Sequence, residues 1–397
     1  MKRAPLLVAL FLAALALRPA LVGIGPLLPL VQDDLGVSHA VAGLLGTIPV
    51  LCMGIFAPPA RFVSGRIGSR RAVGLSLMLI GCFGVARALA PGAAGVILLT
   101  FPIGIGMGLA GAILPVLVKE RVADRPGFAT GVYTTGITIG SALAAATAVP
   151  LAHLAGGWRA PLLVFGVVAA GLAVVWLRLT RAEPAHRRVH LRPLRLPLRR
   201  VLAWRLVAAF FFMSSVFYGL NAWLPDAYVE RGWSDASAGG LLAVVNAVTI
   251  PCGFAVAWAA DHWGSRRGWL TGAAALQCVT LLGILLWPAG GWVWAVVLGL
   301  AIGPLFPLTM TLPLDAADHP AEVAALAGMM LGVGYTLAAL SPFLLGALRD
   351  LTGGFDAVIA ALAAASAVLV VVDWSFTPAR LAAGRSSGGR LPRAASS

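Results

Sequence analysis

Gly68-Ser69-Arg70-Arg71 recurs 196 residues later as Gly264-Ser265-Arg266-Arg267, and this repeated tetrapeptide is part of a longer internal repeat. At an offset of 197, Leu154-Ala155-Gly156-Gly157-Trp158 corresponds to Leu351-Thr352-Gly353-Gly354-Phe355. An offset of this length excludes a solenoid of short repeats and indicates two copies of one large unit. Six further residues recur at an offset of 196: Pro29, Gly36, Ser38, Ala40, Ala42 and Gly43 return as Pro225, Gly232, Ser234, Ala236, Ala238 and Gly239.

The composition is that of a membrane protein. The chain is 60% hydrophobic and 11% charged, with a mean hydropathy of +0.93, so it has too few polar groups to cover an ordinary soluble domain. Apolar runs of about 20 residues are long enough to cross about 30 Å of hydrocarbon as helices. We predict an all-α membrane protein of two pseudo-symmetric six-helix halves, the architecture in which secondary transporters hold a solute between halves. The twelve predicted spans are 4–30, 39–61, 72–90, 94–118, 127–152, 158–180, 203–224, 237–260, 268–287, 291–314, 322–347 and 355–376.

The charged residues are distributed unevenly between the predicted loops. The formal net charge is +14, and 24 of the 29 Lys and Arg fall on one side of the membrane when both termini are placed in the cytoplasm. This positive-inside bias predicts cytoplasmic termini and basic loops that attract anionic lipid headgroups. No motif of basic and aromatic residues accompanies the charge, so we expect no nucleic-acid partner. The predicted external loops hold mainly acids: Asp33, Asp34, Asp226, Glu230, Asp235, Asp350 and Asp356.

Changes in composition divide the chain into four segments. We predict an N-terminal six-helix half at 1–180, a basic cytoplasmic linker at 181–202 and a C-terminal six-helix half at 203–376. The linker is interrupted by prolines and is too polar to enter the bilayer. We predict that residues 377–397, which are rich in Gly, Ser and Arg, form a disordered cytoplasmic tail.

The two copies of the repeated tetrapeptide belong to longer loop motifs. They are Gly65-Arg66-Ile67-Gly68-Ser69-Arg70-Arg71 between spans 2 and 3, and Asp261-His262-Trp263-Gly264-Ser265-Arg266-Arg267 between spans 8 and 9. Both resemble the cytoplasmic loop signature of the major facilitator superfamily, Gly-x3-Asp-Arg-x-Gly-Arg-Arg. The first copy has Gly65 where the signature has Asp, and the second keeps Asp261 but has His262 where it has Arg. The resemblance implies gating loops that contain Arg66, Gly68, Arg70, Asp261, Gly264 and Arg266.

Finer similarities extend over nearly all twelve spans. Six segments carry them: 17–19 (Leu-Arg-Pro), 25–29 (Gly-Pro-Leu-Leu-Pro), 217–225 (Phe-Tyr-Gly-Leu-Asn-Ala-Trp-Leu-Pro), 231–234 (Arg-Gly-Trp-Ser), 305–308 (Leu-Phe-Pro-Leu) and 334–340 (Gly-Tyr-Thr-Leu-Ala-Ala-Leu). These segments are similar to the cyanate/2-nitroimidazole transporter branch (CynX/NimT type) of that superfamily. The resemblance implies a major facilitator fold, alternating access and a place in a bacterial inner membrane.

The same resemblance implies which spans line the pathway. Spans 1, 4, 7 and 10 are expected to line the cavity, spans 2, 5, 8 and 11 to form its sides, and the others to form an outer scaffold. The alternative for each side chain near this path is a purely structural role in helix packing or helix–helix hydrogen bonding. The residues placed near the path are Tyr218, Asn221 and Trp223 on span 7, Asn246 on span 8, Phe306 on span 10 and Tyr335 on span 11.

Arg18 is the residue that most directly indicates a function. At 1.5 Å per residue it lies about 20 Å from one end of span 1 and about 18 Å from the other. An Arg at mid-membrane costs at least about 2.5–3.5 kcal/mol on insertion scales, so we expect it to face the cavity as the anchor of a small anion. Alternatively, Arg18 is structural and binds carbonyls freed by Pro19 or Pro26. Arg87 lies near the external end of span 3, from where we expect its side chain to reach the membrane surface.

Two classes of solute fit these residues. One is a small anionic or polar planar solute of the cyanate type, and the other is a small heteroaromatic compound, for which the aromatic side chains would dominate and the chain would act as an exporter. The sequence has no nucleotide-binding loop, metal-ligand cluster or catalytic triad, so we expect no enzymatic activity, cofactor or metal. No Asp or Glu lies near mid-depth in a predicted span, which argues against a carboxylate proton relay and leaves the coupling open. We expect a monomer.

Overall fold

The computed structural model describes residues 3–121, 126–181, 196–262, 266–317 and 319–377. Within those ranges every regular element is a helix, and twelve segments are long and apolar enough to cross a membrane. The predicted fold class is confirmed. The first half of the chain forms α1 (Arg3–Leu15), α2 (Pro19–Val22), η1 (Gly25–Leu27), α3 (Leu28–Leu35), α4 (His39–Ile67), α5 (Ser69–Ala88), α6 (Ala93–Arg121), α7 (Pro126–Leu154) and α8 (Arg159–Leu179). The second half forms α9 (Val201–Glu230), α10 (Asp235–His262), α11 (Arg266–Leu286), η2 (Pro288–Gly290), α12 (Gly291–Ala316), α13 (Pro320–Ala338), α14 (Ser341–Thr352) and α15 (Asp356–Trp374).

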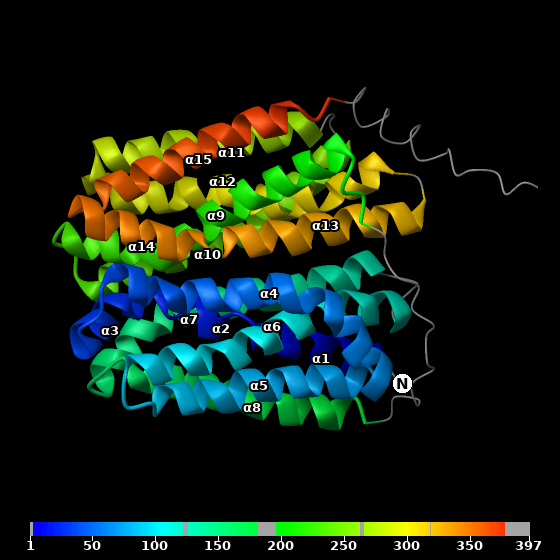
Figure 1. The fold of residues 1–397 in the computed structure, drawn as a ribbon, viewed down its shortest axis with the longest axis horizontal. Helices are drawn as coiled ribbons and strands as arrows, with labels where there is room; N and C mark the ends of the chain where they lie inside the picture. Colours follow the sequence, from blue (N-terminus) through cyan, green and yellow to red (C-terminus); the bar gives the residue numbers. More distant parts are fainter. Residues whose placement is uncertain (1–2, 122–125, 182–195, 263–265, 318, 378–397) are drawn as a thin grey trace, which may run out of the picture.

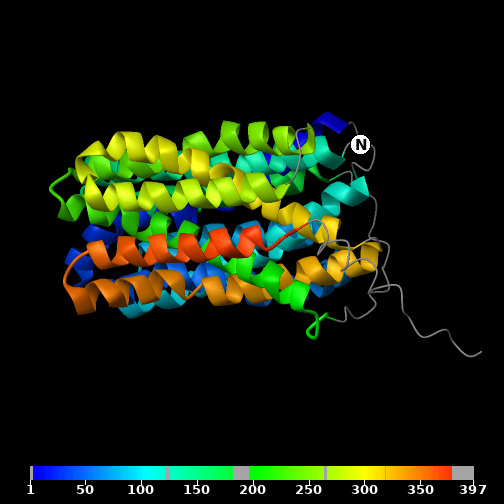
Figure 2. The same cartoon turned by 90° about the horizontal axis from the view of Figure 1, so that it is seen from above.

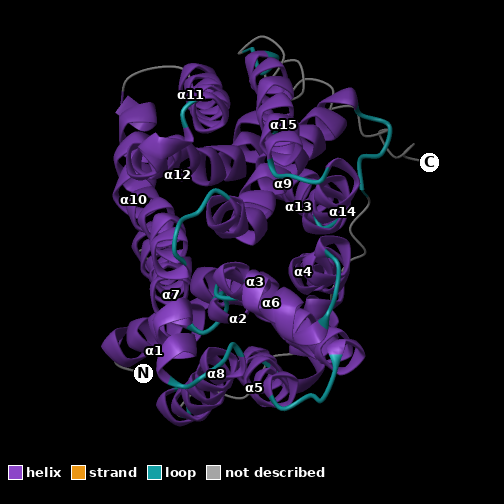
Figure 3. Ribbon diagram, turned by 90° about the vertical axis from the view of Figure 1, so that its left-hand side faces the viewer, coloured by secondary structure: helices purple, strands orange, loops and turns teal. Residues whose placement is uncertain are grey.

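The helices form two bundles that lie side by side. Figure 1 shows α1 to α8 in the lower bundle and α9 to α15 in the upper one, with all long helices running along the same axis. The end-on view separates the two groups again (Figure 3). The bundles meet where α4 packs against α13 and α14, and where α7 packs against α10. Any solute held between the halves would therefore lie between these two seams.

The start of the first described helix and the end of the last one lie at the same end of the bundle (Figure 2). We call this the near end and the opposite one the far end. The predicted linker and tail lie mostly in residues 182–195 and 378–397, outside the described ranges. Helix α9 begins at Val201, inside the segment predicted as linker.

The sequence repeat reflects turns that both halves need. Gly36 and Gly232 have φ angles of 60° and 85°, and Gly156 and Gly353 have φ angles of 73° and 77°. This left-handed region favours glycine because a Cβ would clash with the backbone there. Two serines follow the first pair of turns and cap the next helices, since the side chains of Ser38 and Ser234 accept hydrogen bonds from backbone N–H groups three residues later. These parts of the repeat therefore record turns at the far end, whereas the repeated tetrapeptide begins after α4 at the near end.

Two of the twelve spans are broken rather than continuous. The first span is divided into α1, α2, η1 and α3, and the eleventh into α13 and α14. Proline lacks the N–H that an α-helix needs, and Pro19, Pro26 and Pro342 each stand near the start of a new helical segment. Proline alone does not cause a break, because α4 continues through Pro49, Pro58 and Pro59.

Close backbone contact joins the first span to the other half. A methyl group added at Gly25 would overlap the carbonyl oxygen of Asn221, so η1 and α9 touch backbone to backbone. Glycine lets transmembrane helices approach in this way, since contact packing must hold them together in lipid. This contact fixes the middle of the first span against α9.

The acids predicted for the external loops lie mainly in helices instead. Asp33 and Asp34 belong to α3, Asp226 and Glu230 to α9, and Asp350 to α14, while Asp235 and Asp356 are the first residues of α10 and α15. The prediction placed them in loops because the helices end later than the apolar runs do. Asp226 is 7% exposed, so it is buried rather than solvated.

Candidate functional site

Arg18 lies at the break in the first span, between α1 and α2. Its backbone carbonyl accepts hydrogen bonds from the N–H groups of Leu21 and Val22, which starts the short helix α2. The side chain is half-buried and points to the other half of the molecule, where it meets α9. Because it packs against that half and keeps some accessible surface, Arg18 borders the space between the halves.

The Arg18 guanidinium is bound by a tyrosine of the opposite half. Its Nη1 donates to the Tyr218 hydroxyl over 2.8 Å, and its central carbon, Cζ, lies 5.7 Å from the centre of the Tyr218 ring. The Tyr335 hydroxyl is the second polar group that faces the guanidinium. Among the described residues, no carboxylate forms an ion pair with Arg18, and its side chain does not bind a carbonyl freed by Pro19 or Pro26. The positive charge is therefore bordered by hydroxyls and aromatic rings.

Aromatic rings continue this group along the second half. The Tyr218 and Tyr335 ring centres are 6.3 Å apart, and the Phe210 ring meets Tyr335 edge to face at 4.7 Å. Phe306 adds a ring 6.4 Å from Phe210 and is 43% exposed. Aromatic pairs at these distances add about 0.5–1.5 kcal/mol each to the packing. The arrangement offers one cation, two hydroxyls and flat apolar faces, which together suit a small anion or a planar polar molecule.

Asn221 and Asn246 bind each other beside this group. The Asn246 amide donates to the Asn221 side-chain oxygen over 3.3 Å and to the Leu242 carbonyl over 2.9 Å. Asn221 donates in turn to the Phe217 carbonyl over 2.8 Å. Both asparagines are buried, and these bonds satisfy part of their polar surface. They join α9 to α10.

Trp223 lies apart from the Arg18 group. Its side chain is fully buried, and its indole N–H donates to the Pro342 carbonyl over 2.8 Å. The indole ring faces His39 and Phe355 near the far end, at ring distances of 5.7 Å and 5.9 Å. Trp223 thus packs the far end of the seam between the halves.

The loop residues of the first half join neighbouring helices. The Arg70 guanidinium donates to the Thr180 hydroxyl and the Leu177 carbonyl, and the Trp176 indole donates to the Arg70 carbonyl over 2.9 Å. Gly68 has a φ angle of 86° between α4 and α5. Arg66 is exposed. Arg70 thus ties α5 to α8 at the near end.

The corresponding loop of the second half is only partly described. The Arg266 guanidinium binds both oxygens of Asp315 at 2.7 Å, which ties α11 to α12. Arg267 stacks over the Trp374 ring at 3.7 Å. Asp261 lies in the last turn of α10, but its side chain and the whole of Gly264 lie outside the described part of the chain.

Arg87 does not reach the membrane surface, so that prediction is wrong. Its side chain is 1% exposed and donates to the Ala20 carbonyl over 3.1 Å. The break in the first span exposes this carbonyl, and α5 lies close enough for Arg87 to bind it. Sequence could not show this contact, because it depends on where the first span breaks.

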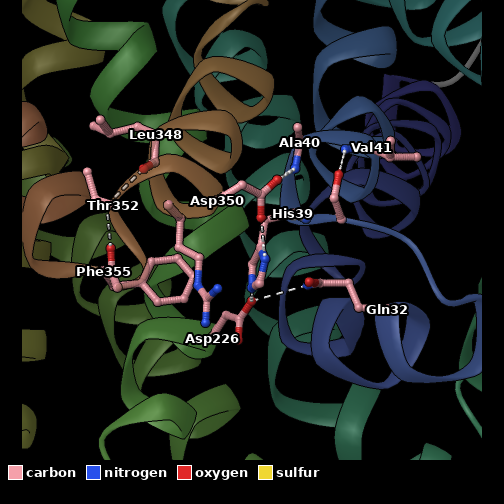
Figure 4. Close-up of polar contacts among 12 residues, drawn as sticks. Gln32, His39, Ala40, Val41, Asp226, Leu348, Asp350, Thr352 and Phe355 are labelled. Atoms are coloured by element: carbon pink, nitrogen blue, oxygen red, sulfur yellow. Dashed lines mark hydrogen bonds and ion pairs between the residues drawn. The ribbon is translucent and has the colours of Figure 1, made fainter.

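Sequence reasoning also missed Phe210 and a polar cluster at the far end that contains His39, Asp226 and Asp350 (Figure 4). Phe210 is one of many apolar residues on α9, and only its orientation toward Tyr335 distinguishes it. His39 and Asp350 are 311 positions apart, and no local motif signals that they meet.

Comparison with known proteins places these features in a family. The profile of the Major Facilitator Superfamily matches residues 6–339. The cyanate transport protein CynX of Escherichia coli (strain K12) is 31% identical over 379 residues, which cover 94% of this chain and 98% of that protein. The 2-nitroimidazole transporter of the same organism is 29% identical over 374 residues, which cover 93% and 94%. The crystal structure of a D-xylose-proton symporter has a TM-score of 0.74 at 16% identity, covers 95% of this chain and 98% of that chain, and shows a shared fold.

Proposed function

Because the chain belongs to the Major Facilitator Superfamily and is a multi-pass membrane transporter of small solutes, we propose that its solute is a small anion or polar planar molecule of the cyanate type. Arg18 would be the intramembrane anchor of that anion. The observation that carries the proposal is a half-buried guanidinium at a break in the first span, bound by the Tyr218 hydroxyl with the Tyr335 hydroxyl beside it and, among the described residues, by no carboxylate.

The energetics favour an anionic partner for Arg18. A charged side chain deep in the membrane costs at least about 2.5–3.5 kcal/mol, and a hydroxyl neutralises none of that charge. A small anion would supply the missing charge and accept hydrogen bonds from two guanidinium nitrogens at once. The Tyr218 hydroxyl would then either donate to the anion or yield its place to it. Tyr335 stands close enough to act as a second donor.

The geometry fits alternating access. Discontinuous transmembrane helices form the solute sites of several transporter folds, and the first span is discontinuous on both sides of Arg18. Arg18 and Tyr218 belong to different halves, so a solute bound to both would be released when the halves separate. Arg70 and Arg266 would keep the helices of each half together during that movement, and Arg66, Gly68, Asp261 and Gly264 would take part in gating as members of the same two motifs.

A second solute class has an observation in its favour. Phe210, Tyr218 and Tyr335 form a continuous aromatic group with Phe306 at its exposed side. Such rings could stack on a small heteroaromatic compound, and the 2-nitroimidazole transporter is among the similar proteins. In that case the chain would be an exporter, and Arg18 would serve structure.

We further propose an orientation in a bacterial inner membrane with both termini in the cytoplasm. The near end would then face the cytoplasm and its anionic headgroups, and the far end would face outward. The segments 1–180 and 203–376 would be the two halves, joined by the cytoplasmic linker 181–202, and the tail 377–397 would extend into the cytoplasm. The carrier would act as a monomer.

Solute flux in proteoliposomes tests the proposal. Purified protein is reconstituted, and uptake is measured for cyanate, other small anions and neutral nitroimidazoles. We expect saturable flux of at least one small anion that excess of the same anion inhibits. Flux of neutral aromatics alone would overturn the anion proposal in favour of the second class.

A further inference from the structure

A histidine crosses from one half to the other at the far end. His39 is the first residue of α4, and its ring lies between two carboxylates of the second half (Figure 4). Its Nδ1 is 2.8 Å from Asp350 Oδ1, and its Nε2 is 3.7 Å from Asp226 Oδ2. The Asp226 carboxylate also accepts a hydrogen bond from the Gln32 amide over 3.2 Å. Two elements of the first half, α3 and α4, are thus tied to α9 and α14.

Asp350 also caps α4 from the opposite half. Its two carboxylate oxygens accept hydrogen bonds from the backbone N–H groups of His39 and Ala40, at 3.2 Å and 2.9 Å. The first N–H groups of a helix have no partner within the helix, and negative charge is favourable there. This part of the contact does not depend on the charge of the His39 ring, whereas the contacts of the ring itself do.

The positions of the two ring nitrogens favour the protonated imidazole. A neutral imidazole has one N–H, so one of its nitrogens would present a lone pair to a carboxylate oxygen. A protonated imidazole has an N–H on each nitrogen, and both His39 nitrogens face a carboxylate. The ring therefore fits this site best when it carries a positive charge.

The surroundings of the ring are acidic and little screened by water. The His39 and Asp226 side chains are 17% and 10% exposed. From α9, Glu230 adds another negative charge, but Arg349 of α14 binds it at 2.8 Å and balances it. Trp223 and Phe355 cover the ring on its other sides, and Gln32 on α3 is uncharged. Without the charge of His39, Asp226 would keep only the more distant Arg349, which already binds Glu230, and among the described residues no cation would stand between the Asp226 and Asp350 carboxylates.

We propose that His39, Asp226 and Asp350 form a proton-operated latch, which holds the far end closed when His39 is protonated and releases it when His39 loses the proton. Histidine is the side chain whose charge ordinarily changes between about pH 5 and pH 8. Loss of the proton leaves two carboxylates facing a neutral ring, so within this cluster only the backbone contacts of Asp350 and the Gln32 hydrogen bond still join the two halves. The far end then opens more often. This goes beyond the proposed solute, because the latch acts on the conformation whatever the carrier moves.

The test measures opening directly and needs no solute. Ala222 is buried below the latch, next to Gly25 and Gly46 of the first half, so a cysteine there is reached from outside only when the halves part. The native Cys52, Cys82, Cys252 and Cys278 are replaced by serine, and Ala222→Cys is labelled in proteoliposomes with a membrane-impermeant maleimide. Leu154→Cys, at an 86% exposed position at the end of α7, gives the pH dependence of the reagent itself.

The ratio of the labelling rate at Ala222→Cys to that at Leu154→Cys is expected to rise about fivefold or more between pH 5.5 and pH 8. Fivefold is about the smallest effect typical of coupling between a binding event and a change of conformation. With His39→Gln the ratio should be high at both pH values. His153→Gln is the matched control, because His153 also faces an acid of the other half, Asp235 at 3.8 Å, but is 57% exposed. It should respond to pH like the parent protein.

Three outcomes would overturn the latch. They are a ratio that does not change with pH in the parent protein, an unchanged pH response in His39→Gln, or loss of the response in His153→Gln alone. If His39→Gln does not give monodisperse protein, Asp226→Asn removes the acid that faces Nε2 and should flatten the pH response as well. Failure of the anion proposal would leave these rates unaffected, so the two ideas are tested separately.

Discussion

The Arg18 guanidinium and the Tyr218 hydroxyl lie 2.8 Å apart, although 200 positions in the sequence separate them. Arg18 belongs to the first half and Tyr218 to the second, so this hydrogen bond crosses from one half to the other. The repeat does not duplicate the charge, because the residue 196 positions after Arg18 is Ser214. The halves share a fold but contribute different chemistry to the space between them.

Substitution of Arg18 separates a binding role from a structural one. Arg18→Ala should abolish anion binding and leave the ligand-free melting temperature close to that of the parent protein, since the mutation removes an uncompensated charge. Arg18→Lys keeps the charge but loses the planar fork, so affinity should fall about 10- to 150-fold, the equivalent of one charged hydrogen bond. Both are read from ligand-induced thermal shift. An Arg18→Ala protein that melts much earlier yet still responds to the anion would show that Arg18 is structural.

Removal of the Tyr218 hydroxyl should lower stability. Tyr218→Phe leaves a deep guanidinium without its described partner, so we expect a loss of about 1–3 kcal/mol in the ligand-free protein. Tyr228→Phe is a matched control on the same helix, because the buried Tyr228 hydroxyl has no hydrogen-bond partner among the residues that the structure describes. That substitution should leave the melting temperature unchanged or raise it. Equal losses in both variants would contradict the role given to the Arg18–Tyr218 bond.

Arg70 should matter to stability and Arg66 should not. Arg70→Ala removes the bonds that tie α5 to α8, and we expect a loss of about 1–3 kcal/mol. Arg66 is exposed four residues earlier, so Arg66→Ala should stay within about 0.5 kcal/mol of the parent protein. Thermal melting in detergent measures both. A larger loss for Arg66→Ala would mean that the exposed arginine makes contacts essential to the fold.

The orientation of the chain can be tested at the linker. Single cysteines introduced within 181–200 should react with an impermeant maleimide only in inside-out vesicles, because the basic loops are expected in the cytoplasm. Cysteines at the far-end turn, such as Gly92→Cys, should show the opposite pattern. Labelling of the linker from outside intact cells would show that the chain has the opposite orientation.

Much of the fold could be predicted from the sequence, because it depends on patterns that act locally. Apolar runs of membrane length are sufficient to place the helices, and the turn glycines Gly36 and Gly232 repeat because the same left-handed turn is needed twice. The resemblance to the cyanate and 2-nitroimidazole transporters is confirmed over most of the chain. The end of α9 was missed because Asp226 and Glu230 are polar, although the helix continues through them.

The site could be predicted only in part. Arg18 stands out by its depth, and the structure brings Tyr218 and Tyr335 to it. The sequence cannot tell which of many prolines break a helix, since α4 continues through three of them while the first span is divided. It also cannot tell how each helix is rotated, which decides that Trp223 faces His39 and that Arg87 binds the Ala20 carbonyl. These contacts depend on packing between segments far apart in the chain.

In the proposed alternating access, the contact between Gly25 and the Asn221 carbonyl would be the point about which the two halves tilt. It lies between the latch at the far end and the loops at the near end, and it has no side chain that could bend or step aside. Two rigid bodies that touch at such a point can tilt about it, so the opening of one end closes the other. A single added methyl group at Gly25 would move the axis of that tilt and would therefore change how far the near end and the far end open.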